Sequence, residues 1–116
     1  MQFVITAYDG EGMLDRRLKV RPDHLENIAR MKDRVLCAGG LLDDEGKMKG
    51  SVLVMEFENR KQVDEYLKSE PYYTEHVWEK VTVETMNVVL LDRKVVGKSE
   101  GEGLVCSRFR TRKRSA

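Results

Sequence analysis

The sequence is poor in the residues from which metal sites and disulfide frameworks are built. Its 116 residues include 2 cysteines, Cys37 and Cys106, and 2 histidines, His24 and His76. The cysteines are far apart, and neither has a second Cys or a His at metal-ligand spacing, so we predict no disulfide framework and no metal site. Cys37 lies in an apolar run and is predicted to be a buried small hydrophobe. This cysteine usage favours a reduced, cytoplasmic protein.

The signatures of a membrane span, a secretory signal and a nucleotide site are also missing. No stretch is long and apolar enough to span a bilayer, and the first residues do not follow the basic-then-apolar order of a signal peptide. The segment Gly10-Glu11-Gly12 follows a predicted strand but lacks the third glycine of the dinucleotide fingerprint. We therefore expect no redox or nucleotide cofactor.

Charge is abundant and unevenly distributed. Charged residues make up 35% of the chain, with a net charge of +1. Residues 1–92 hold 13 Lys/Arg and 18 Asp/Glu, whereas residues 93–116 hold 8 Lys/Arg and 2 Glu. We predict one acidic domain over residues 1–92 and a flexible, disordered basic tail over residues 93–116. The basic run Arg108–Arg114 could contact nucleic acid, but a solubilising extension is favoured.

The apolar pattern predicts four strands and the helices between them. Helical spacing predicts one helix that starts near Met13 and ends before Pro22, another that begins at Pro22, and a third capped by Asn59. Alternation and apolar runs predict strands at residues 2–8, 35–42, 50–58 and 77–91, with a hairpin turn at 43–46. The order βαββαβ fits an α+β, ferredoxin-like fold with the helices on one face of an antiparallel sheet.

That fold leaves the other face of the sheet without a cover. The strand at residues 50–58 carries apolar residues on both faces, for example Val52 and Leu53. Large exposed apolar patches are rare on soluble monomers, so we expect a homodimer formed through the sheet.

The motif RPDHL at residues 21–25 contains the first candidate for chemistry. It places His24 just after a proline, where a helix would turn its side chain inward. Histidine changes charge near neutral pH, so in a cleft it can carry a proton; the alternative is a surface or hydrogen-bonded core histidine. Arg21 could hold an anionic or phenolate oxygen, or form a surface salt bridge. His76 lies among acidic residues and is predicted to be solvated.

Five further residues are candidates for the lining of a pocket. Gly39 and Gly40 could let backbone N–H groups approach a ligand, or could mark a strand bulge. Ser51 could donate a hydrogen bond into the pocket. Tyr72 and Trp78 could wall an aromatic substrate, or could be core or interface residues.

The motifs RPDHL, AGG (38–40), GS (50–51) and EPYYTEHVWE (70–79), in this order, resemble the YciI-like (YCII-related) family over about residues 1–92. The resemblance implies a ferredoxin-like domain that dimerises face to face, in the dimeric α/β-barrel style of muconolactone isomerase-type proteins. It also implies a His/acid pair in a cleft. His24 matches the family histidine, and Glu70 stands where the family has the aspartate of an Asp-Pro-Tyr motif. Glutamate keeps the charge and adds a methylene, so its backbone must lie slightly farther from the imidazole.

The resemblance implies a reaction type without giving a substrate. One branch of the family eliminates HCl from a chlorinated hydroxyquinol. We expect a cofactor-independent lyase or isomerase in which His24, held by Glu70, abstracts a proton from a small cyclic oxygenated metabolite. The alternative is a non-catalytic dimeric module that binds a metabolite in the same cleft. A closed, partly apolar pocket with His24 and Glu70 in contact favours the enzyme, and a shallow pocket with the two apart favours the module.

Overall fold

The computed structural model describes residues 1–96, so Cys106 and the run Arg108–Arg114 lie outside the described residues. The chain divides into a unit at Met1–Met86 and a second unit that begins at Asn87. The predicted boundary at residue 92 and the predicted tail stay predictions.

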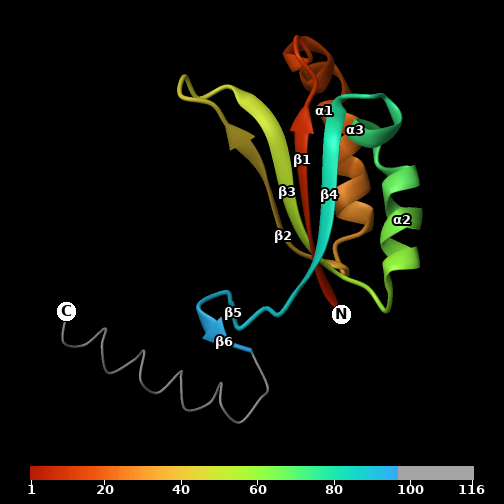
Figure 1. Cartoon of the computed structure of the whole chain (residues 1–116), viewed down its shortest axis with the longest axis vertical. Coiled ribbons are helices and arrows are strands. Elements are labelled where there is room, and N and C mark those ends of the chain that lie inside the picture. Colours follow the sequence, from red (N-terminus) through yellow and green to blue (C-terminus); the bar gives the residue numbers. More distant parts are fainter. Residues whose placement is uncertain (97–116) are drawn as a thin grey trace, which may run out of the picture. The chain divides into compact units, whose positions relative to one another are not determined.

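The first unit has the predicted βαββαβ order and a ferredoxin-like sheet (Figure 1). The sheet order is β2-β3-β1-β4, and all its neighbouring strands are antiparallel. The helices lie on one face of this sheet (Figure 1). The elements are β1 (Gln2–Asp9), α1 (Leu14–Arg30), β2 (Val35–Leu42), β3 (Met48–Glu56), α2 (Arg60–Ser69), the short α3 (Pro71–Thr74) and β4 (Trp78–Met86).

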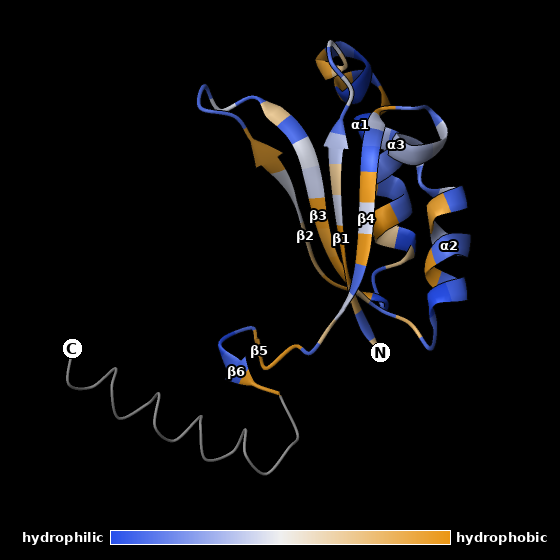
Figure 2. Cartoon of the chain, in the orientation of Figure 1, coloured by the Kyte–Doolittle hydropathy of each residue, from blue (hydrophilic) through white to orange (hydrophobic). Residues whose placement is uncertain are grey.

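The core forms between the sheet and the helices because the strands alternate. In β1, every second side chain is buried, beginning with Phe3 and Ile5. In β3, Leu53 and Met55 are buried in the same way, while Val52 and Val54 point to the opposite face. Apolar and polar residues also alternate around α2 (Figure 2), and its buried side chains are Val63, Tyr66 and Leu67. Asn59 caps α2 as predicted, because its side chain accepts a hydrogen bond from the Gln62 N–H.

The prediction of two helices separated at Pro22 was wrong. A single helix, α1, runs through the proline. A proline in a helix interior removes one backbone hydrogen bond and costs about 3 kcal/mol. The residues that α1 turns toward the sheet nevertheless keep helical spacing on both sides of Pro22. They are Arg17, Val20, His24 and Asn27. Burial along this continuous stripe offsets the local cost.

The last strand is shorter than predicted. We expected it to reach Leu91, but β4 ends at Met86, which pairs with Gln2 at the start of β1. The partner strand ends there, so pairing cannot continue. In the second unit, β5 (Leu90–Leu91) and β6 (Lys94–Val95) form a separate hairpin. Asp92 and Arg93 join them with φ of 51° and 63°, as a tight turn of the mirror-image type requires.

The face of the sheet opposite the helices is not covered by any other element of residues 1–86 (Figure 1). Val4, Val52 and Val54 are half-buried there, and Val4 pairs with Val54 across β1 and β3. Cys37, which pairs with Val54 from the edge strand β2, is exposed. The prediction that Cys37 is buried was therefore wrong, because β2 lies at the edge of the sheet. None of the described helices combines the length and apolar character that crossing a membrane requires.

Candidate active site

A cavity of about 210 Å³ lies between α1 and the strands β2 and β3. Its walls combine apolar side chains, such as Leu25 and Ile28 of α1 and Leu53 of β3, with a few polar groups. This mixture is typical of small-molecule sites. Six residues that the sequence indicated for a pocket line it: Arg21, His24, Gly39, Gly40, Ser51 and Tyr72.

The predicted contact between His24 and Glu70 is present. Nδ1 of His24 lies 2.6 Å from Oε1 of Glu70. The His24 side chain is 12% exposed and the Glu70 side chain is fully buried. Because a carboxylate can only accept, the hydrogen of this bond is on Nδ1, and Nε2 is then the basic nitrogen of the neutral ring. Nε2 makes no hydrogen bond with a described residue.

Glu70 is fixed at the junction of two helices. It is the C-cap of α2 and the N-cap of α3, where its side chain accepts from the Tyr72 N–H at 3.2 Å. Its second oxygen, Oε2, accepts from the Tyr66 hydroxyl at 2.6 Å. Pro71 begins α3, a position where its missing N–H costs nothing. The EPY motif thus builds the junction and places a buried acceptor in reach of α1.

Tyr72 stacks on the imidazole of His24, and Trp78 does not line the cavity. The His24 and Tyr72 rings are stacked, with centroids 4.1 Å apart and an interplanar angle of 19°. Trp78 is 6% exposed and packs against Tyr72 with a centroid distance of 5.9 Å. The cavity lining does not include it. The prediction that Trp78 walls the substrate is therefore corrected to a core position, the alternative that the sequence left open.

Arg17 is a buried cavity residue that the sequence analysis missed. It is 2% exposed, and Nη2 donates to the Gly50 carbonyl and to Ser51 Oγ, both at 2.6 Å. Nη1 lies 3.2 Å from Ser51 Oγ and 3.5 Å from Asp9 Oδ1. Because Ser51 Oγ accepts these bonds, its own hydrogen is what remains for a ligand. The guanidinium also lies 4.4 Å from the centroid of the Tyr72 ring.

Asp9 supports Arg17 from the end of β1. The register of β1 and β4 shifts between Tyr8 and Asp9, and the Asp9 side chain is 6% exposed. Burial raises the pKa of Asp9 above its ordinary value, and the charge of Arg17 opposes the shift. Neither carboxylate oxygen meets the geometry of a hydrogen bond with the described residues. Asp9 therefore contributes a long ion pair and no directed bond.

The glycines of the two short motifs have different roles. A Cβ at Gly50 would collide with the Ala7 carbonyl oxygen, so the close approach of β1 and β3 requires glycine there. A Cβ at Gly39 would meet nothing within 4 Å, and one at Gly40 would make ordinary contact with Met48. The register shifts of β2 fall on either side of Gly39 and Gly40. The absence of side chains there leaves room in the cavity wall.

Arg21 and His76, the remaining residues singled out in the sequence, are both exposed. Arg21 lines the cavity, is exposed and forms no ion pair with a described residue. The surface salt bridge that was its alternative is thus not formed. His76 is exposed, as predicted. No group of three potential metal ligands was found among the described residues.

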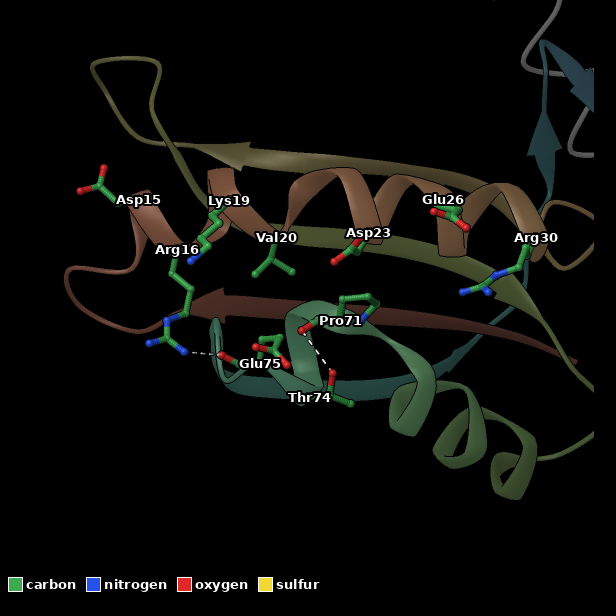
Figure 3. A pocket seen from close by; sticks show the side chains of 10 residues that line it. All are labelled: Asp15, Arg16, Lys19, Val20, Asp23, Glu26, Arg30, Pro71, Thr74 and Glu75. Carbon is green, nitrogen blue, oxygen red and sulfur yellow. Dashed lines mark hydrogen bonds between the residues drawn. The ribbon is translucent and has the colours of Figure 1, made fainter.

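A larger groove of about 760 Å³ lies between α1 and α3 (Figure 3). Its walls are mostly charged side chains of both signs, and Arg16 donates to the Glu75 carbonyl at 3.2 Å across it. None of the predicted site residues lines this groove. It brings together no buried acid–base pair, so we place the candidate active site in the smaller cavity.

Fold and cavity together define a ferredoxin-like domain with a histidine–carboxylate pair. Residues 1–87 match the family model described as the YCII-related domain, and the chain belongs to this family. Protein YciI of Escherichia coli is 33% identical over 97 residues, which cover 77% of this chain and 99% of that protein. Aspercryptin biosynthesis cluster protein B of Emericella nidulans is 32% identical over 67% of this chain, but the match spans only 56% of that protein.

A solved structure is similar in both fold and sequence. It is 5-chloro-2-hydroxyhydroquinone dehydrochlorinase from Burkholderia phenoliruptrix, in complex with 2,5-dihydroxybenzoquinone. The TM-score is 0.69 and the sequence identity 26%, over 74% of this chain and 93% of that chain. The fold of this chain is thus that of the dimeric α/β-barrel structures.

Proposed function

We propose that this protein is a small cofactor-independent enzyme of lyase or isomerase type that acts on a small, cyclic, oxygenated metabolite. The observation that carries the proposal is the 2.6 Å contact between His24 and Glu70 at the wall of a cavity. Nε2 of His24 is the general base, and Glu70 is the positioning residue.

The geometry supports a proton abstraction by His24. Glu70 accepts the Nδ1 hydrogen, so the basic lone pair is on Nε2, and the carboxylate stabilises the imidazolium that forms. Stacking on Tyr72 restricts rotation of the ring. The proton of a ring carbon or hydroxyl moves to Nε2, and the electrons of the broken bond form a new double bond. In an elimination, the leaving group, for example chloride, departs with its bonding electrons.

The similar dehydrochlorinase supports the choice of substrate class. Its structure holds 2,5-dihydroxybenzoquinone, a planar six-membered ring with oxygen substituents. The partly apolar cavity of this chain, with a stacked His24–Tyr72 pair at its wall, suits a ligand of that shape.

Two further parts of the proposal concern the state of the protein. We propose a homodimer in which the uncovered sheet face of one copy packs on that of the other, supported by half-buried valines at Val4, Val52 and Val54. We also propose a reducing, cytoplasmic setting, which a free and exposed Cys37 fits.

The test is chloride release from 5-chloro-2-hydroxyhydroquinone by the wild-type protein and by His24→Gln. General acid–base groups contribute roughly 10²–10⁴-fold, so we expect a loss of that size. Glu70→Gln should cost less, because it spoils the orientation of the base without deleting it. His76→Gln, at the exposed histidine, is the matched control and should keep full activity.

Equal chloride release by wild type and His24→Gln contradicts the mechanism. A wild-type protein that binds the compound at His24 and never turns it over identifies the alternative, a non-catalytic dimeric binding module.

A further inference from the structure

The cavity is lined by positive and neutral groups. Arg17 and Arg21, one turn apart on α1, contribute two guanidinium groups. No aspartate or glutamate is among the described residues that line it. Glu70 is fully buried and faces His24, and Asp9 lies beyond Arg17 at the end of β1. A ligand in the cavity therefore meets cationic groups first.

Arg17 and Arg21 differ in whether their guanidinium groups are already bonded within the protein. The terminal nitrogens of Arg17 are engaged by Gly50, Ser51 and Asp9, so Arg17 contributes a fixed charge. Arg21 forms no ion pair with any described residue, and its guanidinium can turn to a ligand in the mouth of the cavity. A planar guanidinium with free donors suits the oxygen of a carboxylate or phenolate.

The Tyr72 hydroxyl is a second candidate donor. Tyr72 is 1% exposed and lines the cavity, and its hydroxyl is not one of the fully buried polar atoms of the described residues that lack a partner. Burial raises the pKa of Tyr72. The charges of Arg17 and Arg21 lower this pKa, and those of Glu70 and Asp9 raise it further. The phenol stays protonated at neutral pH and can donate.

We propose that this cavity binds a small planar oxyanion, either a carboxylate or the enolate or phenolate of a ring, whose charged oxygen accepts hydrogen bonds from the Tyr72 hydroxyl and the Arg21 guanidinium. Arg17 supplies the fixed positive charge behind them. The inference rests on the proposed function, because it names the charge of the ligand that His24 faces. It assigns to Tyr72 a polar role in addition to its stacking on His24.

Benzoate and benzamide are the probes, because they have nearly the same shape and differ in charge. Affinities are measured by isothermal titration calorimetry, and the signals of His24 in NMR spectra locate the binding. For the wild type we expect benzoate to bind at least about tenfold more tightly than benzamide. Hydrogen bonds to charged groups are worth about 1.5–3 kcal/mol, so Tyr72→Phe and Arg21→Gln should each reduce that ratio about tenfold or more.

Two control variants separate this role from structural effects. Tyr73→Phe also removes one tyrosine hydroxyl, but Tyr73 is exposed and does not line the cavity. Lys19→Gln removes a positive charge from α1 on the side of the larger groove. Both should leave the ratio of the two affinities unchanged.

Benzamide binding as tightly as benzoate, or an unchanged ratio in Tyr72→Phe, overturns the oxyanion site. Benzamide binding at His24 would still leave a small-molecule cavity for the proposed enzyme. Failure of both probes to bind also overturns the inference, and chloride release then decides the proposed function separately.

Discussion

At the residue scale, Glu70 is the side chain on which several elements converge. It accepts hydrogen bonds from Tyr66 of α2, from the Tyr72 N–H of α3 and from His24 of α1. It is fully buried, and Tyr66 and Tyr72 are buried with it, so these two residues have no water to bond in its place. Loss of the acceptor leaves buried donors unpaired, which is more costly than the net value of the bonds themselves.

We therefore expect Glu70→Ala to lower the free energy of unfolding by about 3 kcal/mol or more. His24→Gln removes only one donor from the same network and should cost about 1 kcal/mol. Urea denaturation followed by circular dichroism measures both. Equal losses in the two variants would show that Glu70 is not the centre of the network.

Tyr66 makes stability sensitive to alkaline pH. Burial, together with the charge and hydrogen bond of Glu70, raises the pKa of Tyr66 far above its ordinary value of 10.0. Above pH 10, the unfolded chain releases this proton while the folded chain keeps it. The contribution is complete below pH 10 and is lost as the pH rises above it.

The expected result is a fall in the free energy of unfolding above pH 10 that is shallower in Tyr66→Phe than in the wild type. Urea titrations at pH 8 to 11 measure the slope. Tyr73→Phe, at an exposed tyrosine, is the control. Identical slopes in the wild type and Tyr66→Phe would contradict the assignment.

At the element scale, α1 connects the fold to the cavity. Its buried stripe carries Arg17 and His24, and Arg21 lies on the turn between them. The positions of these side chains relative to one another depend on one unbroken helix. Pro22 interrupts the hydrogen bonds of that helix without breaking it.

Pro22→Ala restores a backbone donor inside α1, so we expect the free energy of unfolding to rise by about 1 kcal/mol or more. Pro71→Ala is the matched control, because Pro71 begins α3, where proline is favourable, and its replacement should lower stability. Thermal unfolding of the two variants compares them. A loss of stability in Pro22→Ala would contradict this expectation and show that the proline favours the folded state.

The elements also show what local sequence signals can predict. The β-branched and aromatic residues at 2–8 and the cap at Asn59 are local signals, and both predictions are confirmed. The resemblance to the family predicted the contact of His24 with Glu70, and the structure places Nδ1 of His24 2.6 Å from Oε1 of Glu70. Pro22 is a strong local signal as well, but the buried stripe of α1 outweighs it.

Two residues escaped prediction because their burial is set by distant parts of the chain. Arg17 is one of many charged residues in its helix, and its only signal was its helical spacing from Val20 and His24. Its buried partners come from β1 and β3. Cys37 lies in a run of apolar residues that predicts burial, and no local pattern shows that β2 is an edge strand.

At the scale of the whole molecule, the uncovered sheet face is the proposed interface between two copies of the chain. Val4, Val52 and Val54 lie on it half-buried in a single copy. A second copy would remove these side chains from water at roughly 25 cal/mol for each Å² of apolar surface covered.

Val54→Lys places a charge at the centre of this face, and we expect it to shift the protein from dimer to monomer. Light scattering at micromolar concentration measures the mass. Leu18→Lys is the control, since Leu18 is 52% exposed on α1, on the helical side, and should leave the dimer intact. A monomeric wild type, or a dimer that persists in Val54→Lys, would contradict the proposed interface.

The cap position of Glu70 has a consequence for how mutations at the two halves of the pair would be tolerated. A library screened only for folded, protease-resistant protein should reject most replacements at Glu70, since its oxygens accept hydrogen bonds from the first turn of α3 and from the Tyr66 hydroxyl of α2. The same screen should accept many residues at His24, which is partly exposed and contributes one bond. Only a screen for turnover would reject both. Comparing the two screens would separate the residue that maintains the architecture from the residue that performs the chemistry.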